Sequence, residues 1–163
     1  MKIKIIACGD TGVTLKAGER LAKMLDGVEV IDGRSKKFDL DADIYVLGTN
    51  VHFGKFNKQF IKLVNKLKDA RIFVYISGAE VEKNDFYIEK ARSLLPDALD
   101  IRYVWGELSS AGKPFFKRFA IQSFIDGRKK DGLPKPQILD KELRYLKQSI
   151  KDEVALTKLE GNV

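Results

Sequence analysis

The residues best suited to chemistry near the start of the chain are Cys8-Gly9-Asp10-Thr11-Gly12-Val13-Thr14. They lead into a segment of helical spacing, and a helix N-terminus offers backbone N–H groups and a positive dipole end to a phosphate. The stretch has no Lys or Arg, and its spacing matches neither G-x-G-x-x-G nor a Walker loop. Two interpretations stay open: a phosphate site built from neutral donors, or a plain strand–turn–helix connection with Thr11 or Thr14 as the N-cap.

A second informative stretch, Gly48-Thr49-Asn50-Val51-His52-Phe53-Gly54-Lys55-Phe56, follows an apolar run. Gly54 lets the backbone reorient, and Phe53 is suited to lie against a planar ring. The alternatives are a connection whose aromatic residues join the core and, for His52, an ordinary exposed histidine. The stretch therefore predicts either one wall of a ligand site or a structural loop.

Other reactive residue types are scarce. Cys8 is the only cysteine and His52 the only histidine, which excludes an internal disulfide framework and leaves little for zinc. We expect Cys8 to be a small buried side chain rather than a nucleophile. No Ser-His-Asp set, pair of catalytic carboxylates or metal cluster can be assembled, so any redox chemistry would belong to a bound cofactor.

The elements that must position these stretches alternate between strand and helix. The 163 residues suit one domain. Uniformly apolar strands between helices predict a parallel sheet covered on both faces, with five strands in the order 2-1-3-4-5. Residues 32–43 either form a brief helix or cross over irregularly. Strands are expected at 2–7, 28–31, 44–47, 71–76 and 99–105, and helices at 13–25, 56–67, 88–95, 115–125 and 139–156.

The stretch Gly9-Asp10-Thr11-Gly12-Val13-Thr14 resembles the FMN-phosphate loop of flavodoxins. Gly48 to Phe56, followed by Phe60 and Val64, is similar to one branch, the flavodoxin-type menaquinone-dependent protoporphyrinogen dehydrogenases. Gly106 and the later Phe116-Lys117-Arg118-Phe119 resemble that branch as well, so the resemblance covers most of residues 1–126. It implies a flavodoxin-like three-layer α/β sandwich with FMN as the cofactor.

The resemblance also implies the site. The phosphate would sit on residues 10–14, the isoalloxazine between residues 49–54 and 77–80, and the third wall would be residues 106–109. Ala7 and Gly9 replace the family's usual aromatic and hydroxyl residues, and residues 77–81 contain no aromatic. The implied cofactor-binding residues are Asp10, Thr11, Gly12, Val13, Thr14, Thr49, Asn50, Val51, His52, Phe53, Gly54, Ser77, Gly78, Ala79, Gly106 and Glu107.

Charge adds two surface features. The chain carries a net charge of +7, and residues 113–163 alone hold 12 basic and 7 acidic side chains. Lys55, Lys58, Lys62 and Lys66 recur at helical spacing and would share one face. A second cluster combines Lys117, Arg118 and Arg128-Lys129-Lys130 with Phe115, Phe116, Phe119 and Phe124. These are either a solvated lysine face and a core-packing phenylalanine stripe, or surfaces for an anionic membrane or porphyrin carboxylates.

The resulting prediction is one flavodoxin-like domain over residues 1–163, with 127–163 as a basic helical extension. Its expected function is FMN-dependent redox chemistry, as an electron carrier or a dehydrogenase of the protoporphyrinogen type. Expected partners are a redox protein, or a quinone or porphyrin-like substrate, with an anionic membrane surface as a further candidate and nucleic acid not expected. The short apolar run at residues 1–7 predicts no signal peptide, and the expected location is cytoplasmic or peripheral at the inner membrane face. The alternative is a flavin-free regulatory or interaction module on the same fold.

Overall fold

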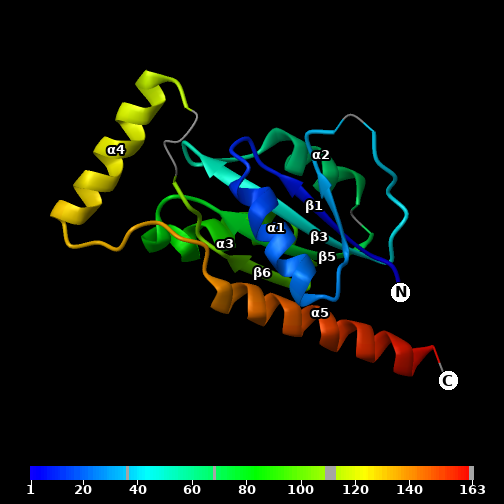
Figure 1. Cartoon of the computed structure of the whole chain (residues 1–163). Helices are drawn as coiled ribbons and strands as arrows, with labels where there is room; N and C mark the ends of the chain where they lie inside the picture. The colour runs from blue at the N-terminus through cyan, green and yellow to red at the C-terminus, as the bar shows by residue number, and fades with distance from the viewer. Residues whose placement is uncertain (36, 68, 109–112, 162–163) are drawn as a thin grey trace.

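The computed structural model describes residues 1–35, 37–67, 69–108 and 113–161. Its core is a parallel sheet with the strand order β2-β1-β3-β5-β6 (Figure 1). Because the small strand β4 lies off this path, the order is the one predicted from the sequence. The parallel strands are β1 (Ile3–Cys8), β2 (Glu29–Asp32), β3 (Ile44–His52), β5 (Arg71–Ser77) and β6 (Asp100–Tyr103).

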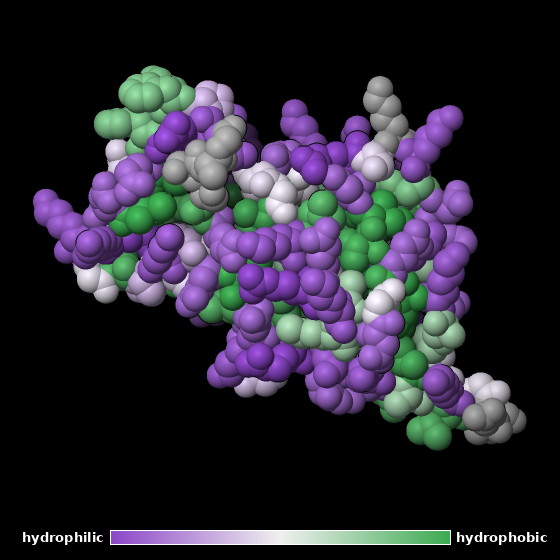
Figure 2. Space-filling model, in the orientation of Figure 1, coloured by the Kyte–Doolittle hydropathy of each residue, from purple (hydrophilic) through white to green (hydrophobic). Residues whose placement is uncertain are grey.

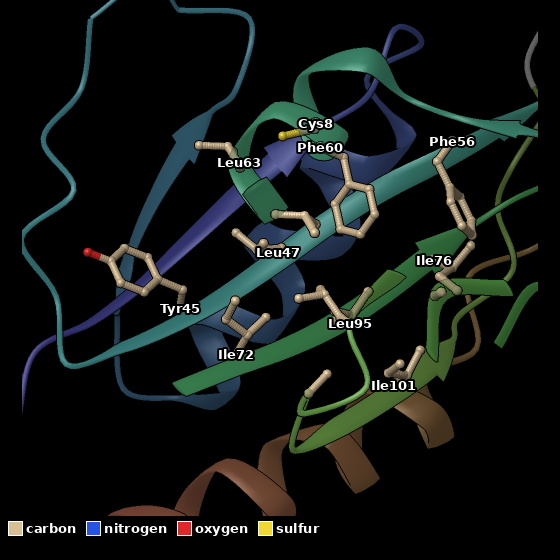
Figure 3. Close-up of a cluster of buried hydrophobic side chains, with 14 of the residues drawn as sticks. Cys8, Tyr45, Leu47, Phe56, Phe60, Leu63, Ile72, Ile76, Leu95 and Ile101 are labelled. Carbon is tan, nitrogen blue, oxygen red and sulfur yellow. The ribbon is translucent and has the colours of Figure 1, made fainter. Parts of the chain in front are cut away.

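Helices cover both faces of the sheet, which confirms the three-layer architecture. The helices α1 (Val13–Met24) and α5 (Asp140–Glu160) share one buried cluster, which includes Leu21 and Leu146. The helices α2 (Lys58–Lys66) and α3 (Asn84–Leu94) cover the opposite face. Figure 3 shows this second cluster, in which Phe60 and Leu47 lie among side chains from the strands. Cys8 belongs to it and is 1% exposed, as expected of a small buried side chain.

The strand register brings the informative loops together. Cys8 of β1 lies beside Thr49 of β3, and Thr49 lies beside Ile76 of β5. Because these strands are parallel, the segments after them leave the sheet at the same edge. We call this the carboxyl edge.

The region after residue 47 differs from the prediction. The strand β3 continues to His52 and turns back through Phe53 and Gly54 into β4 (Lys55–Phe56), which pairs antiparallel with it. Residues 49–52 are therefore strand rather than loop. Lys55 lies on β4, so it is not part of the α2 lysine face. Among the described residues between 32 and 43, no helix forms, so this crossover is irregular.

Helix α4 (Phe115–Lys130) lies apart from the layers, on the side to which the strands' carboxyl ends point (Figure 1). It continues to Lys130, five residues beyond the end that the sequence predicted at residue 125. Phe115, Phe116 and Phe119 are exposed, so of the two interpretations of these residues, the core-packing stripe is wrong. Among the described residues, none of the helices is long and apolar enough to cross a bilayer.

Tyr75 of β5 packs on the face of the sheet that α1 and α5 cover. Its side chain is fully buried, and its hydroxyl donates a hydrogen bond of 2.8 Å to the carbonyl oxygen of Thr14. Two glycines make room for the ring: a Cβ on Gly48 would lie 2.1 Å from its Cζ, and a Cβ on Gly18 would lie 2.6 Å from its hydroxyl oxygen. The hydrogen bond from Tyr75 therefore ties the start of α1 to β5.

We expect Gly48→Ala to lower the free energy of unfolding by at least about 2 kcal/mol, because the new methyl group overlaps the Tyr75 ring. The matched control is Gly127→Ala on α4, where a Cβ meets nothing within 4 Å. There we expect a gain of about 0.5–1 kcal/mol, because alanine is the better helix former. Urea unfolding followed by circular dichroism measures both changes. Equal effects at the two positions would show that Gly48 is not a packing requirement.

Candidate functional site

A buried hydroxyl cluster ties the carboxyl edge together. The Oγ1 of Thr14 lies 2.8 Å from the Oγ of Ser77, and this Oγ lies 3.3 Å from the carbonyl oxygen of Thr49. All three residues are buried. The cluster joins the start of α1 to the ends of β5 and β3, so these hydroxyls are engaged inside the protein.

The N-terminus of α1 has no side-chain cap. Gly12 is the N-cap residue and adopts a φ of 80°, a left-handed conformation that glycine tolerates. One interpretation of the sequence had expected Thr11 or Thr14 to cap the helix, but neither side chain does so. The first-turn amide groups consequently receive no side-chain acceptor, which is the arrangement that suits an anion.

The charged groups beside this loop are engaged with other side chains. The carboxylate of Asp10 accepts a hydrogen bond of 3.0 Å from the side chain of Asn57. Lys16 forms an ion pair of 2.5 Å with Glu107. An anion at this helix start would therefore be held mainly by backbone groups.

The β3–β4 hairpin presents an exposed aromatic ring. Phe53 and Gly54 adopt φ values of 47° and 73°, as the two central residues of a type I′ turn do. A left-handed conformation is unfavourable for phenylalanine, and the ring is 91% exposed. Lys90 on α3 donates to the carbonyl oxygen of Gly54 and thereby holds the turn in place.

Two adjoining cavities form a cleft between this hairpin and the segments after β5 and β6. We call it the carboxyl-edge cleft; its parts have volumes of about 690 and 130 Å³. The larger part is lined by Val51, His52, Phe53, Gly54, Gly78, Ala79, Glu80, Lys83, Phe86, Tyr87 and Tyr103. The smaller part is lined by Thr11, Val13, Asn50, Val51, His52, Ser77, Gly78, Ala79, Gly106, Glu107 and Leu108.

The cleft thus brings together most of the residues predicted to bind a cofactor. Four of them do not line it: Asp10, Gly12, Thr14 and Thr49. Of these, Thr14 and Thr49 belong to the buried hydroxyl cluster. Gly106 and Glu107 line the smaller cavity, and Ser109 lies outside the described residues.

The aromatic residues on the far side of the cleft were missed. The segment after β5 has no aromatic, but Phe86 and Tyr87 from α3 and Tyr103 from β6 line the larger cavity. The only sequence feature that could have indicated Phe86 and Tyr87 was their adjacency at the start of a helix, and Tyr103 lay within an expected strand. The Tyr103 hydroxyl also donates to the carbonyl oxygen of Glu80 at 3.0 Å, and the Trp105 indole donates to that of Ala79 at 2.9 Å. These two bonds fix the segment after β5.

Asn50 lines the smaller part of the cleft. It is 7% exposed, and its side-chain oxygen is the one buried side-chain polar atom without a hydrogen-bond partner among the described residues. Such an atom costs about 1–3 kcal/mol when left unsatisfied. The amide oxygen therefore keeps an unused capacity to accept a hydrogen bond.

A third cavity, of about 570 Å³, lies against α2 and the residues after β1 and β2, and shares Asn50, His52 and Phe53 with the cleft. We call it the basic cavity, because Arg34, Lys55, Lys58 and Lys62 line it and, among the described residues, Asp10 is its only carboxylate. The Arg34 guanidinium also binds Asp32 through two nitrogens and lowers the pKa of that carboxyl.

The groups that could react directly are few. Burial raises the pKa of the Cys8 thiol to about 12, so it stays protonated at neutral pH and is a poor nucleophile. In the part of the chain that the structure describes, no three His, Cys, Asp or Glu side chains gather to hold a metal ion.

Comparison with known proteins identifies the fold. No protein-family model matches the chain, and no curated protein sequence matches it. A putative flavoprotein from Bacteroides eggerthii has a similar structure, with a TM-score of 0.50 and 13% identity over 77% of this chain and 96% of that one. Oxidised Flavodoxin 1 from Bacillus cereus gives 0.49 and 15% over 76% and 94%. A Lactobacillus acidophilus flavoprotein solved with FMN gives 0.47 and 16% over 64% and 91%. The likeness to the Bacteroides eggerthii structure, together with the strand order β2-β1-β3-β5-β6, shows a flavodoxin-like fold.

Substitutions at the two loop threonines should differ in their effect on the free energy of unfolding. Thr14→Val removes the bond to Ser77 and leaves a buried hydroxyl with one partner fewer, so we expect a loss of about 1–2 kcal/mol in the free energy of unfolding. Thr11→Val, at an exposed residue that lines the cleft, should leave stability within about 0.5 kcal/mol of the wild type. Urea unfolding measures both. A larger loss at Thr11 than at Thr14 would contradict the assignment.

Proposed function

We propose that the protein binds FMN in the carboxyl-edge cleft and acts as a redox protein. The observation that carries this proposal is the unpartnered amide oxygen of Asn50, a residue that lines the smaller part of the cleft. FMN offers donors of the required kind, in its ribityl hydroxyls and ring N–H groups. The similarity of the fold to a protein described as a putative flavoprotein supports the same proposal.

The remaining parts of the site suit the other parts of FMN. The uncapped N-terminus of α1 would hold the phosphate through backbone N–H groups. Phe53 on the hairpin and Phe86 on α3 line the larger cavity and offer apolar surface to a planar ring. Gly78 and Gly106 approach closely, since a Cβ on Gly106 would lie 3.3 Å from the Gly78 carbonyl oxygen. Their missing side chains leave room in the smaller cavity.

When bound, FMN would supply the electron-transfer chemistry, which no described side chain can supply. The chain's own residues would position the cofactor and tune it. Backbone groups of Phe53 and Gly54 would face the ring edge, in a turn that Lys90 holds rigid. The rigid wall at Ala79 and Glu80 would limit the access of water.

Addition of FMN to the purified protein should give saturable quenching of flavin fluorescence. We expect Asn50→Leu to weaken this binding at least about tenfold, because it removes an acceptor for the ligand. The same variant should be as stable as the wild type without FMN, or more stable by about 1 kcal/mol, because an unsatisfied buried atom is lost. The control is Thr14→Val, which should lower stability. No quenching by the wild type at micromolar protein would overturn the proposal.

At a finer level, we propose a dehydrogenase of the protoporphyrinogen type rather than a simple carrier. The support is the basic cavity, which shares Asn50, His52 and Phe53 with the carboxyl-edge cleft. Its lysines could attract the carboxylates of a large ring. Lys66 lies on the same helix but does not line the cavity, which separates its role from those of Lys58 and Lys62.

We therefore expect Lys58→Glu with Lys62→Glu to weaken the binding of protoporphyrin at low salt at least about tenfold, because two attractive charges become repulsive. FMN binding should stay nearly unchanged, and Lys66→Glu alone should have a small effect. Absorbance titration of the porphyrin measures the change. Undiminished porphyrin binding by the double variant would leave the lysines as a solvated face and favour the carrier function.

A flavin-free module on the same fold is the second candidate. It is favoured by the engagement of the Thr14 hydroxyl with Ser77 and by the carboxylate of Asp10 beside the expected phosphate. A freshly purified protein without flavin absorbance, and without any after reconstitution, would support this candidate.

A further inference from the structure

Helix α4 exposes an unusual amount of aromatic surface. Phe115, Phe116 and Phe119 are 83%, 85% and 69% exposed. Their spacing places them within about 100° of the helix circumference, so they form one patch. Hydrophobic colouring marks the surface over the start of α4 in Figure 2. Exposed apolar patches of this kind mark surfaces that contact other molecules. We call this the α4 phenylalanine patch.

The other end of α4 is fixed to the body of the protein. Arg128, the one buried residue of this helix, pairs with Glu82 at 2.7 Å and donates to the carbonyl oxygen of Pro134 at 3.0 Å. Its guanidinium also lies over the rings of Trp105 and Phe124, at 5.5 and 5.8 Å. The patch is therefore carried on a helix whose far end is held firmly.

The surroundings of the patch are basic. Lys117 and Arg118 lie within it in the sequence and are exposed, and Lys129 and Lys130 are exposed at the opposite end of the helix. Asp126 is the only acidic residue of α4. A second copy packing on the same face would place like charges opposite one another, which is unfavourable. An anionic surface would be attracted instead.

We propose that the α4 phenylalanine patch anchors the protein on the surface of an anionic lipid bilayer. Aromatic side chains that project from a basic helix insert at the boundary between headgroups and acyl chains, while the cations meet lipid phosphates. No spanning segment is needed. Arg128, at the other end of α4, pairs with Glu82, close in sequence to the cleft residues Ala79 and Glu80, so the anchoring helix is joined to the wall of the carboxyl-edge cleft.

The test is co-sedimentation of the full chain, without FMN, with vesicles of phosphatidylcholine alone or mixed with phosphatidylglycerol. We expect binding to the anionic vesicles, weakened by salt. Replacing the three patch phenylalanines by serine should weaken it at least about tenfold, because the buried aromatic area is lost. Lys117→Glu with Arg118→Glu should weaken it comparably. Leu156→Ser with Leu159→Ser removes exposed apolar side chains from α5 and should leave binding unchanged.

Three results would overturn the proposal: no binding of the wild type to anionic vesicles, undiminished binding of the phenylalanine variant, or equal loss in the α5 control. A fourth comes from sedimentation velocity without lipid. If the wild type is a dimer and the phenylalanine variant a monomer, the patch is an interface between copies. Unfolding midpoints equal to that of the wild type confirm that the variants are folded. Since no flavin is present, failure here is distinct from failure to bind FMN.

Discussion

The buried phenol of Tyr75 is the contact on which the carboxyl edge depends. The ring fills space that exists only because positions 18 and 48 are glycines, and its hydroxyl supports the carbonyl oxygen of Thr14. Burial raises the pKa of this phenol, so it remains a neutral donor. The first turn of α1 is thus tied to β5 through both its backbone and its side chain. The uncapped amide groups of α1 are held in a fixed place relative to the strands that line the cleft.

Two energetically unfavourable features lie in one short segment, residues 50–53. Asn50 leaves a buried oxygen without a partner, and Phe53, three residues later, adopts a backbone conformation that disfavours its residue type. Neither feature strengthens the fold, whereas the surrounding structure holds both firmly: Ser77 contacts the Thr49 carbonyl, and Lys90 contacts Gly54. Unrelieved costs inside a rigid frame are typical of a site prepared for a ligand.

The sheet order and the layers could be predicted because apolar runs and helical spacing report burial directly. The hairpin could not, because Phe53-Gly54 lacks the usual Asn-Gly signal and phenylalanine seldom adopts a positive φ. The sequence could not tell whether Thr14 points into the loop or the core, since a hydroxyl serves either place. For Phe115, Phe116 and Phe119 the sequence left two interpretations open, a core-packing stripe or a surface, and the structure excludes the first. Aromatic residues at helical spacing predict core, and only the packing reveals that no layer covers them.

Helix α4 is attached to the rest of the protein differently from the helices that cover the sheet. A helix in one of the two layers gains its place by burying an apolar stripe, as α1 does with Leu21 and α5 with Leu146. Helix α4 instead relies on Arg128, whose contacts with Glu82, Pro134 and Trp105 lie near its C-terminal end. Hydrogen bonding to Arg128 lowers the pKa of Glu82, so the pair stays charged at neutral pH. An ion pair with stacked aromatic rings fixes the direction of the helix while leaving its apolar residues for a different contact. The same residue therefore connects the wall of the cleft to the surface that we expect to meet the membrane.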